Sequence, residues 1–252
     1  MSLVLLEDGP AEGVRILTLN DPERRNAMSP DLQQALAAAG ETVANDRDAR
    51  VLVVTGYGSA FSAGADLPAV FHGLDREVSE IRAGLQSIYD CFLRIKRLPI
   101  PTVAAVNGAA VGAGVNLAMA CDVRVAGPRA KFGVTFTKLG IHPGGGCTYF
   151  LTQTLGRQRA FQLIMDGAVL DADEALRLGL VLDVVEDPLA AALETAQRWA
   201  QVDPLLARDI KKAVGIAERG LFDETLEFEG WAQAAAAAHS PQLLEAIARF
   251  AK

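Results

Sequence analysis

The sequence predicts an α/β protein whose core is followed by a helical C-terminal region. Residues 51–55 (VLVVT) and 102–106 (TVAAV) are short, uniformly apolar runs, as expected of strands that are covered on both faces. Helical patterns alternate with these runs, and from Pro188 onward the whole pattern is helical. Alternating strands and helices indicate a layered α/β fold. We therefore expect a core over residues 1–190 and a helical region over residues 191–252.

Local signals define the elements before the first buried strand. Residues 14–20 (VRILTLN) are rich in β-formers and run into the turn signal Asn-Asp-Pro. Ser29 and Pro30 open a helix, because serine caps a helix and proline fits its first position. The residues of this helix that recur at helical spacing, and would face the core, are Leu32, Leu36, Ala39 and Val43.

The middle of the chain combines glycine-rich turns with further elements. Residues 56–64 read as a glycine-rich loop, and residues 68–97 have a mixed helical pattern. A Gly/Ala turn after the strand at 102–106 leads into a helix of small residues at 113–120, followed by a strand at 122–126.

Capping residues mark the helices of the last third of the chain. Asp171 and Glu174 form a capping box, and Gly179 ends that short helix. The remaining helices are expected at 189–201, at 204–219 and from Ser240 onward.

Composition excludes several classes of protein. The formal net charge of −7 argues against nucleic-acid binding, because phosphates need a basic face. The nearly uncharged stretch at 98–121 contains prolines and glycines, so it indicates buried strand and turn rather than a membrane span. Three cysteines without a CxxC pair, and three histidines, argue against a metal site and fit a reducing compartment. Residues 1–10 carry acids and no long apolar run, unlike a signal peptide, so we expect a cytoplasmic protein.

Two common functional motifs are absent and a third is weak. The sequence has neither a GxxxxGK[ST] phosphate loop nor a GxSxG nucleophile elbow. Gly112-Ala113-Gly114 follows a strand and opens a helix, but Leu117 stands where a dinucleotide fingerprint has its third glycine. A nicotinamide-dependent oxidoreductase is therefore a weak alternative.

The same turn can polarise a carbonyl group. The first turn of a helix exposes N–H groups without internal partners, and the helix dipole adds partial positive charge there. Small residues at 112–114 let a ligand approach the backbone, although for this turn taken alone a tight turn without a ligand is the better explanation. A second loop of small residues, 60–67 (AFSAGADL), also follows a buried strand. Two such loops can present two amides to one oxygen, which is an oxyanion hole.

Several segments in order resemble the signatures of the enoyl-CoA hydratase/isomerase (crotonase) superfamily. The resemblance covers about residues 4–252. It is carried by residues 21–28 (DPERRNAM), 60–67, 104–122 (AAVNGAAVGAGVNLAMACD), 132–146 and 175–185. It implies a crotonase spiral of ββα units, with C-terminal helices that build a homotrimer or a dimer of trimers. The implied ligand is an acyl-CoA thioester, and no separate cofactor is expected because CoA is part of the substrate.

The resemblance also implies site residues. The N–H groups of Ala65 and Ala113 would form the oxyanion hole. Ala63, Asp66 and Leu67 would lie near the adenine of CoA. Arg24, Arg25 and Ala27 would lie near pantetheine and the phosphates, although a solvated surface arginine pair is the alternative. The other expected substrate-binding residues are Gly112, Asn116, Phe136, Gly144 and Phe250.

The sequence departs from the hydratase pattern at two of these positions. Hydratases of the family carry glutamates where this chain has Asn116 and Phe136. Neither residue can exchange a proton at neutral pH, so water addition by the usual route should be severely slowed. Histidine can gain or lose a proton near neutral pH, so His142 is a candidate acid or base in place of the missing glutamates. Weaker candidates for lining or catalysis are His72, Glu77, Glu80, Lys138 and Tyr149, whereas Cys147 reads as a buried, inert thiol.

Two functional hypotheses follow. In the first, the chain is an enzyme of the hydratase/isomerase type that acts on a polarised thioester with its proton donor or acceptor elsewhere. In the second, it is a non-catalytic acyl-CoA carrier or sensor, because the binding elements remain while both carboxylates are absent.

Overall fold

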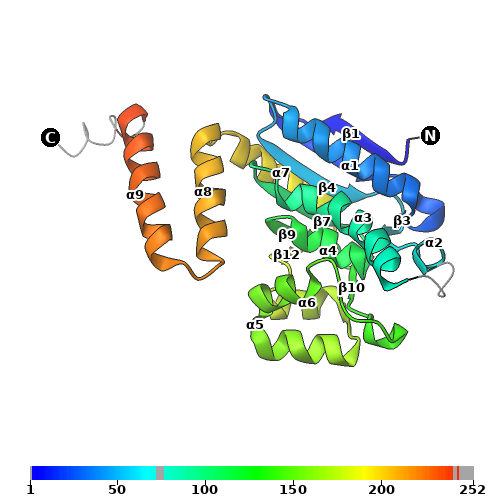
Figure 1. Ribbon diagram of the computed structural model, residues 1–252. Helices are drawn as coiled ribbons and strands as arrows, with labels where there is room; N and C mark the ends of the chain where they lie inside the picture. The colour runs from blue at the N-terminus through cyan, green and yellow to red at the C-terminus, as the bar shows by residue number, and fades with distance from the viewer. Residues whose placement is uncertain (1, 72–76, 241–242, 244–252) are drawn as a thin grey trace. The chain divides into compact units, whose positions relative to one another are not determined.

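A computed structural model of the protein describes residues 2–71, 77–240 and 243. The chain forms two compact units, Met1–Gln201 and Val202–Lys252. The first unit combines helices and strands, and the described part of the second is helical (Figure 1). These features confirm the predicted α/β class with a helical C-terminal region. The assignment of residues 191–252 to oligomerisation stays a prediction.

A six-stranded sheet forms the centre of the first unit. Its strands, in spatial order, are β1 (Val4–Asp8), β2 (Val14–Leu19), β4 (Val51–Gly56), β7 (Thr102–Val106), β9 (Val123–Ala126) and β12 (Asp183–Val184). β1 runs antiparallel to β2, and every other neighbouring pair is parallel. The strands predicted at 14–20, 51–55, 102–106 and 122–126 are thereby confirmed.

Helices cover both faces of this sheet, which explains the uniformly apolar strands. Alternate residues of β4 face opposite sides, because successive side chains of a strand alternate. Val51 and Val53 pack with alanines of α7 (Pro188–Ala200). Leu52 and Val54 belong to the main core, which also holds side chains from α1 (Pro30–Asn45), α3 (Val78–Lys96) and α4 (Ala113–Ala120).

Smaller sheets extend the strands into repeated ββα units. One has the order β11 (Val169–Asp171), β10 (Lys131–Gly133), β8 (Ala109–Val111) and β5 (Ala60–Ser62), and the other pairs β3 (Ala27–Met28) with β6 (Gly64–Ala65). The units β7–β8–α4 and β9–β10–α5 each place two strands before a helix. β5 and the first residue of β6 lie within residues 56–64, which were predicted as a loop, so that prediction is wrong there. These strands are stabilised by pairing with β8 and β3, which are distant in sequence.

Further helices precede or follow the strands. They are η1 (Pro22–Arg24), α2 (Leu67–Phe71), η2 (Thr137–Leu139), α5 (Cys147–Asp166), α6 (Ala172–Leu178), α8 (Pro204–Ala217) and α9 (Phe222–His239). The predicted caps at Ser29 and Asp171 are confirmed, since their side chains accept hydrogen bonds from Leu32 N and Glu174 N. Gly179 ends α6 in the left-handed conformation. Most of the helix predicted after Ser240 lies outside the described residues.

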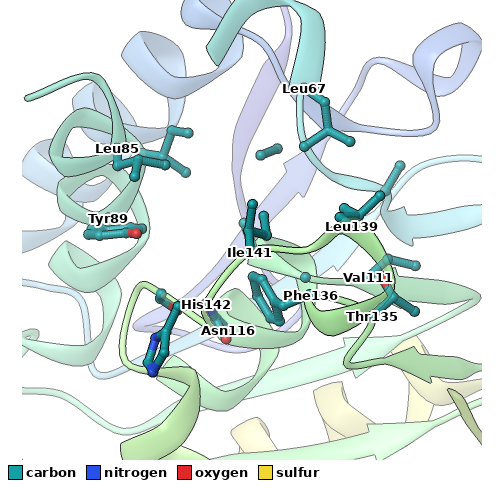
Figure 2. Close-up of a pocket in the computed structure, with 16 residues that line it drawn as sticks. Leu67, Leu85, Tyr89, Val111, Asn116, Thr135, Phe136, Leu139, Ile141 and His142 are labelled. Carbon is teal, nitrogen blue, oxygen red and sulfur yellow. The ribbon is translucent and has the colours of Figure 1, made fainter. Parts of the chain in front are cut away.

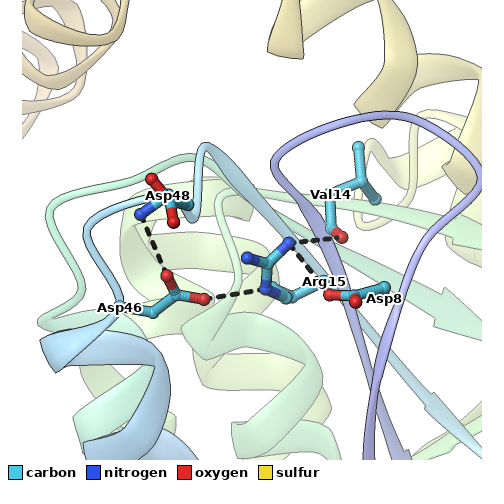
Figure 3. A network of polar contacts seen from close by, with 5 residues as sticks. All are labelled: Asp8, Val14, Arg15, Asp46 and Asp48. Atoms are coloured by element: carbon cyan, nitrogen blue, oxygen red, sulfur yellow. Dashed lines mark hydrogen bonds and ion pairs between the residues drawn. The ribbon is translucent and has the colours of Figure 1, made fainter.

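Arg15 and the carboxylates around it form a cluster that connects the edge of the large sheet to the end of α1 (Figure 3). Arg15 Nε donates to Asp46 Oδ2 at 2.8 Å, and its Nη1 lies 3.2 Å from Asp8 Oδ1. Burial alone would raise the pKa of Asp46. Hydrogen bonds from Asp48 N–H and Arg15, with the charge of Arg15, outweigh burial and lower this pKa. The cluster therefore stabilises the fold at neutral pH and loses this contribution on acidification.

The second unit presents apolar side chains to its surface. α8 and α9 contact each other, and a groove along them is lined by residues that include Leu206, Ile210 and Val214. Leu205, Ile210, Val214 and Trp231 are each more than half exposed. Among the residues that the structure describes, none of the helices has both the length and the apolar character that crossing a bilayer requires.

Asn26 connects the segment after β2 to the glycine-rich segment. It is fully buried and has a left-handed backbone, with φ of 56°. Its Nδ2 contacts the carbonyl oxygens of Tyr57, Ala60 and Phe61 at 2.9–3.2 Å, and its Oδ1 accepts from Asp21 N. Its own carbonyl oxygen accepts from Ser62 Oγ at 2.7 Å. One side chain and its backbone thus fix the path of residues 57–62.

We expect Asn26→Ala to lower the free energy of unfolding by about 2–4 kcal/mol, because it leaves buried carbonyl groups unpaired and puts alanine at positive φ. Asn26→Gly should recover about 1 kcal/mol of this loss, since glycine tolerates the backbone conformation. Urea unfolding followed by circular dichroism measures both changes. Asn45→Ala, on the exposed end of α1, is the matched control and should change stability by less than about 0.5 kcal/mol. Equal effects of Asn26→Ala and Asn45→Ala would contradict the role of Asn26.

Candidate functional site

A pocket of about 290 Å³ lies in the first unit, between the small sheets and α3 (Figure 2). Four segments line it: the β6 region, α3, the turn from β8 into α4, and residues 135–144. The lining residues are Ala63, Ala65, Leu67, Leu85, Ile88, Tyr89, Val111, Gly112, Ala113, Asn116, Thr135, Phe136, Leu139, Ile141, His142 and Gly144. Most of the side chains are apolar, which fits a pocket for a ligand with an aliphatic or aromatic part.

The two predicted amide-bearing turns meet at this pocket. Gly64 has φ of 88°, and a methyl group added there would lie 2.2 Å from Val111 O and 3.3 Å from Ala113 N. The backbone just before Ala65 is therefore in contact with the backbone that leads into α4. Ala113 is the first residue of α4, so its N–H has no partner within that helix. The structure thus brings Ala65, Gly112 and Ala113 to one pocket wall.

Asn116 and Phe136 line the same pocket and make different contacts. Asn116 is 2% exposed, and its Nδ2 donates to Gly144 O at 2.8 Å. Its Oδ1 is buried and has no hydrogen-bond partner in the described part of the chain. Phe136 is half-buried, and its ring would lie 3.8 Å from a methyl group added at Gly112. The wall beside the amide turn is therefore apolar at position 136 and amide-bearing at position 116.

His142 borders the pocket, but its ring is exposed to solvent. Figure 2 shows the ring turned away from Tyr89 and Ile141. Its Nδ1 lies 2.7 Å from Pro143 O, which can only accept, so this contact places the proton on Nδ1. A catalytic role for His142 stays a prediction.

Arg24 contacts a carboxylate next to the pocket. Its guanidinium forms an ion pair with Asp66, the residue after Ala65, while half of its side chain stays exposed. Asp66 thereby holds the segment after β6 to η1, and Arg25 is exposed at the end of η1. Ala27 pairs with Gly64 in the two-stranded sheet rather than lining the pocket.

The weaker candidates lie away from the pocket. Glu77 and Glu80 are exposed at the start of α3, and Lys138 and Tyr149 are exposed and absent from the lining. Burial raises the pKa of the Cys147 thiol to about 12, which supports an inert thiol. His72 and Phe250 lie outside the described residues. Among the described residues, no cluster of three or more potential metal ligands occurs.

Sequence reasoning missed the lining residues of α3. Leu85, Ile88 and Tyr89 recur at helical spacing, which predicts one buried helix face. The pattern does not reveal that this face borders a pocket, because the opposite wall comes from residues 135–144, which are distant in the sequence. Leu139 and Ile141 were missed for the same reason.

Comparison with known proteins identifies the family. The family model for enoyl-CoA hydratase/isomerase matches residues 9–241. The chain belongs to the enoyl-CoA hydratase/isomerase family. The crystal structure of an enoyl-CoA hydratase from Bacillus anthracis covers 98% of this chain and 95% of its own, with a TM-score of 0.89 and 31% identity. These matches confirm the predicted family and crotonase fold.

Relatives within this family have names for different reactions. A probable enoyl-CoA hydratase, EchA14, from Mycobacterium tuberculosis is 49% identical over 183 residues, which are 73% of this chain and 70% of that protein. A 1,2-epoxyphenylacetyl-CoA isomerase from Escherichia coli is 36% identical over 229 residues, which are 86% and 84% of the two chains. The chain is therefore an enzyme of the hydratase/isomerase family, and family membership leaves the reaction open.

We expect Gly64→Ala to disrupt the contact between the β6 region and the turn that leads into α4. The added methyl group would clash with Val111 O, and alanine would be strained at positive φ, so the unfolding free energy should fall by about 2–4 kcal/mol. Thermal unfolding measures the change.

Gly84→Ala is the matched control for this substitution. Gly84 is exposed within α3, and a methyl group there meets nothing within 4 Å. That change should stabilise the protein by up to about 1 kcal/mol, because alanine favours the helix. A Gly64→Ala protein as stable as the Gly84→Ala protein would show that the turns are not in close contact.

Proposed function

We propose that this chain binds an acyl-CoA thioester and that the N–H groups of Ala65 and Ala113 hold its carbonyl oxygen. The proposal is supported by the close approach of the Gly64 backbone to Val111 and Ala113 at the pocket wall. It is further supported by the place of Ala113 at the start of α4, where the helix dipole favours developing negative charge. A preorganised amide of this kind contributes about 2.7–4 kcal/mol to the stabilisation of an oxyanion.

We propose a reaction of the polarised thioester that does not require the two glutamates of the family's hydratases. Asn116 and Phe136 occupy the positions where the family's hydratases carry them, by the resemblance of the surrounding motifs. Polarisation acidifies the carbon next to the carbonyl group, so the reaction we propose is isomerisation or other enolate chemistry, with His142 at the border of the pocket as the acceptor of the α-proton. The similar proteins include one named for isomerisation and one named for hydration, so their names do not decide between these reactions.

The CoA part of the ligand would lie outside the apolar pocket. Arg24, which pairs with Asp66 next to Ala65, and Arg25, exposed at the end of η1, supply positive charge, and arginine pairs well with phosphate. When CoA binds, the Arg24 guanidinium would either leave Asp66 to pair with a phosphate group or contact both at once. We also propose a homotrimer or a dimer of trimers, which the exposed apolar side chains of α8 and α9 support.

A carrier or sensor of acyl-CoA is the second candidate function. The observation that favours it is the amide at position 116 and the aromatic ring at position 136, neither of which exchanges protons at neutral pH. In that case the pocket would bind thioesters without converting them.

Recognition of the carbonyl oxygen is tested by comparing butyryl-CoA with S-butyl-CoA, the thioether that lacks only this oxygen. We expect the thioester to bind about tenfold more tightly, because even one net hydrogen bond is worth about 1–1.5 kcal/mol. Isothermal titration calorimetry measures both affinities, and free CoA serves as the control. Equal affinities for the thioester and the thioether would exclude the proposed role of the two amides.

Turnover assays separate the enzyme from the carrier. We expect the purified protein to convert a 3-enoyl-CoA or another thioester that reacts through an enolate, and to hydrate crotonyl-CoA poorly. Chromatography with mass detection follows substrate and product. Tight thioester binding without conversion of any tested 2-enoyl- or 3-enoyl-CoA would instead support the carrier.

A further inference from the structure

Arg124 lies at the end of α4 that is opposite the amide turn. The helix ends at Ala120, and Cys121 is its C-terminal cap residue. Arg124 Nη1 donates to the carbonyl oxygen of Cys121 at 2.9 Å, and its Nε donates to Leu180 O at 2.8 Å. The last carbonyl groups of a helix have no partners within the helix. The guanidinium therefore supplies a missing partner and fixes this end of α4 to the segment before β12.

The charge of Arg124 is not cancelled by these two acceptors, because both are neutral carbonyl groups. The side chain is half-buried. Burial lowers the pKa of the guanidinium, and the neighbouring Cys121 and Asp122 oppose this effect. Arginine keeps its proton at neutral pH, so the C-terminal end of α4 holds a positive charge.

Asp122 places a negative charge close to the same end of the helix. Its Oδ2 accepts hydrogen bonds from Thr102 N at 2.7 Å and from Thr102 Oγ1 at 2.9 Å, at the start of β7. The cation is thus held by α4 and the segment before β12, whereas the anion is held by β7. Removing one charge or the other should change the electric field along α4 in opposite directions.

The interior position of α4 limits screening by water. All eight residues of the helix are buried. Eight helical residues span about 12 Å, and two unit charges about 12–15 Å apart change an equilibrium by about five- to tenfold at an effective dielectric constant of about 20. A cation at the C-terminal end also offsets the negative end of the helix dipole. Both effects favour negative charge at the N-terminal end, where the Ala113 N–H lies.

We propose that Arg124 is a positioning residue that strengthens the polarisation of a thioester carbonyl group at Ala113, and that Asp122 weakens it. The inference rests on the proposed binding of a thioester by this amide. Neither residue lines the pocket, so both act through the helix and not by contact with the ligand.

The test measures the infrared stretching frequency of the carbonyl group of bound butyryl-CoA, labelled there with a heavy carbon isotope. A more polarised C=O bond absorbs at lower frequency, so binding to the wild-type protein should lower the frequency. Arg124→Met should lose part of this shift, whereas Arg124→Lys should keep most of it because the charge remains. Asp122→Asn should enlarge the shift.

Arg177→Met is the matched control, because Arg177 is exposed on α6 and pairs with Glu174 at the surface. It should keep the wild-type frequency, and thermal unfolding checks that each variant is folded. A wild-type frequency in Arg124→Met would overturn the inference. Shifts in the same direction in Arg124→Met and Asp122→Asn would also overturn it, since a merely structural role predicts the same loss in both.

If Arg124→Met does not fold, the direction of the shift in Asp122→Asn decides the question, and an unchanged or smaller shift there would refute the inference. Binding to the wild-type protein without any change of frequency would contradict the proposed role of the two amides instead. Absence of thioester binding would overturn the proposed function itself.

Discussion

The side-chain amide of Asn26 joins two segments that lie 31–35 residues apart in the chain. Because Asn26 is fully buried, its hydrogen bonds replace those that the carbonyl groups of residues 57–61 would otherwise make to water. Ser62 Oγ extends the connection, since it donates to Asn26 O and accepts from Gly64 N. The position of Ala65, and with it one wall of the pocket, depends on this network.

The pocket gains its chemical character from backbone rather than from ionised side chains. The path through Gly64 brings the β6 region against the turn that opens α4, and the neighbouring side chains are small or apolar. Amide groups in such surroundings act in a low dielectric and require no reorganisation when charge develops. In the function proposed above, these amide groups recognise a class of carbonyl compound, and the side chains around them decide the reaction.

Those side chains differ between the walls of the pocket. Phe136 makes one wall apolar, and Asn116 is committed through Nδ2 to the glycine turn. Tyr89 enters from α3, an element that contributes no part of the sequence motifs. The turn at Gly144 and Gly145 lies against the side chains of both Asn116 and Tyr89.

The sequence by itself determined the family, the α/β class and the helix starts at Ser29 and Asp171, because periodicity, caps and short motifs are local properties. It also identified Ala65, Ala113, Asn116 and Phe136 as neighbours of one site, through their motifs. Only the tertiary structure decided that β5 and β6 are strands, that Arg24 pairs with Asp66, and that Tyr89 lines the pocket. Each of these depends on partners far away in the sequence, and such contacts are set by how the layers pack rather than by any local pattern.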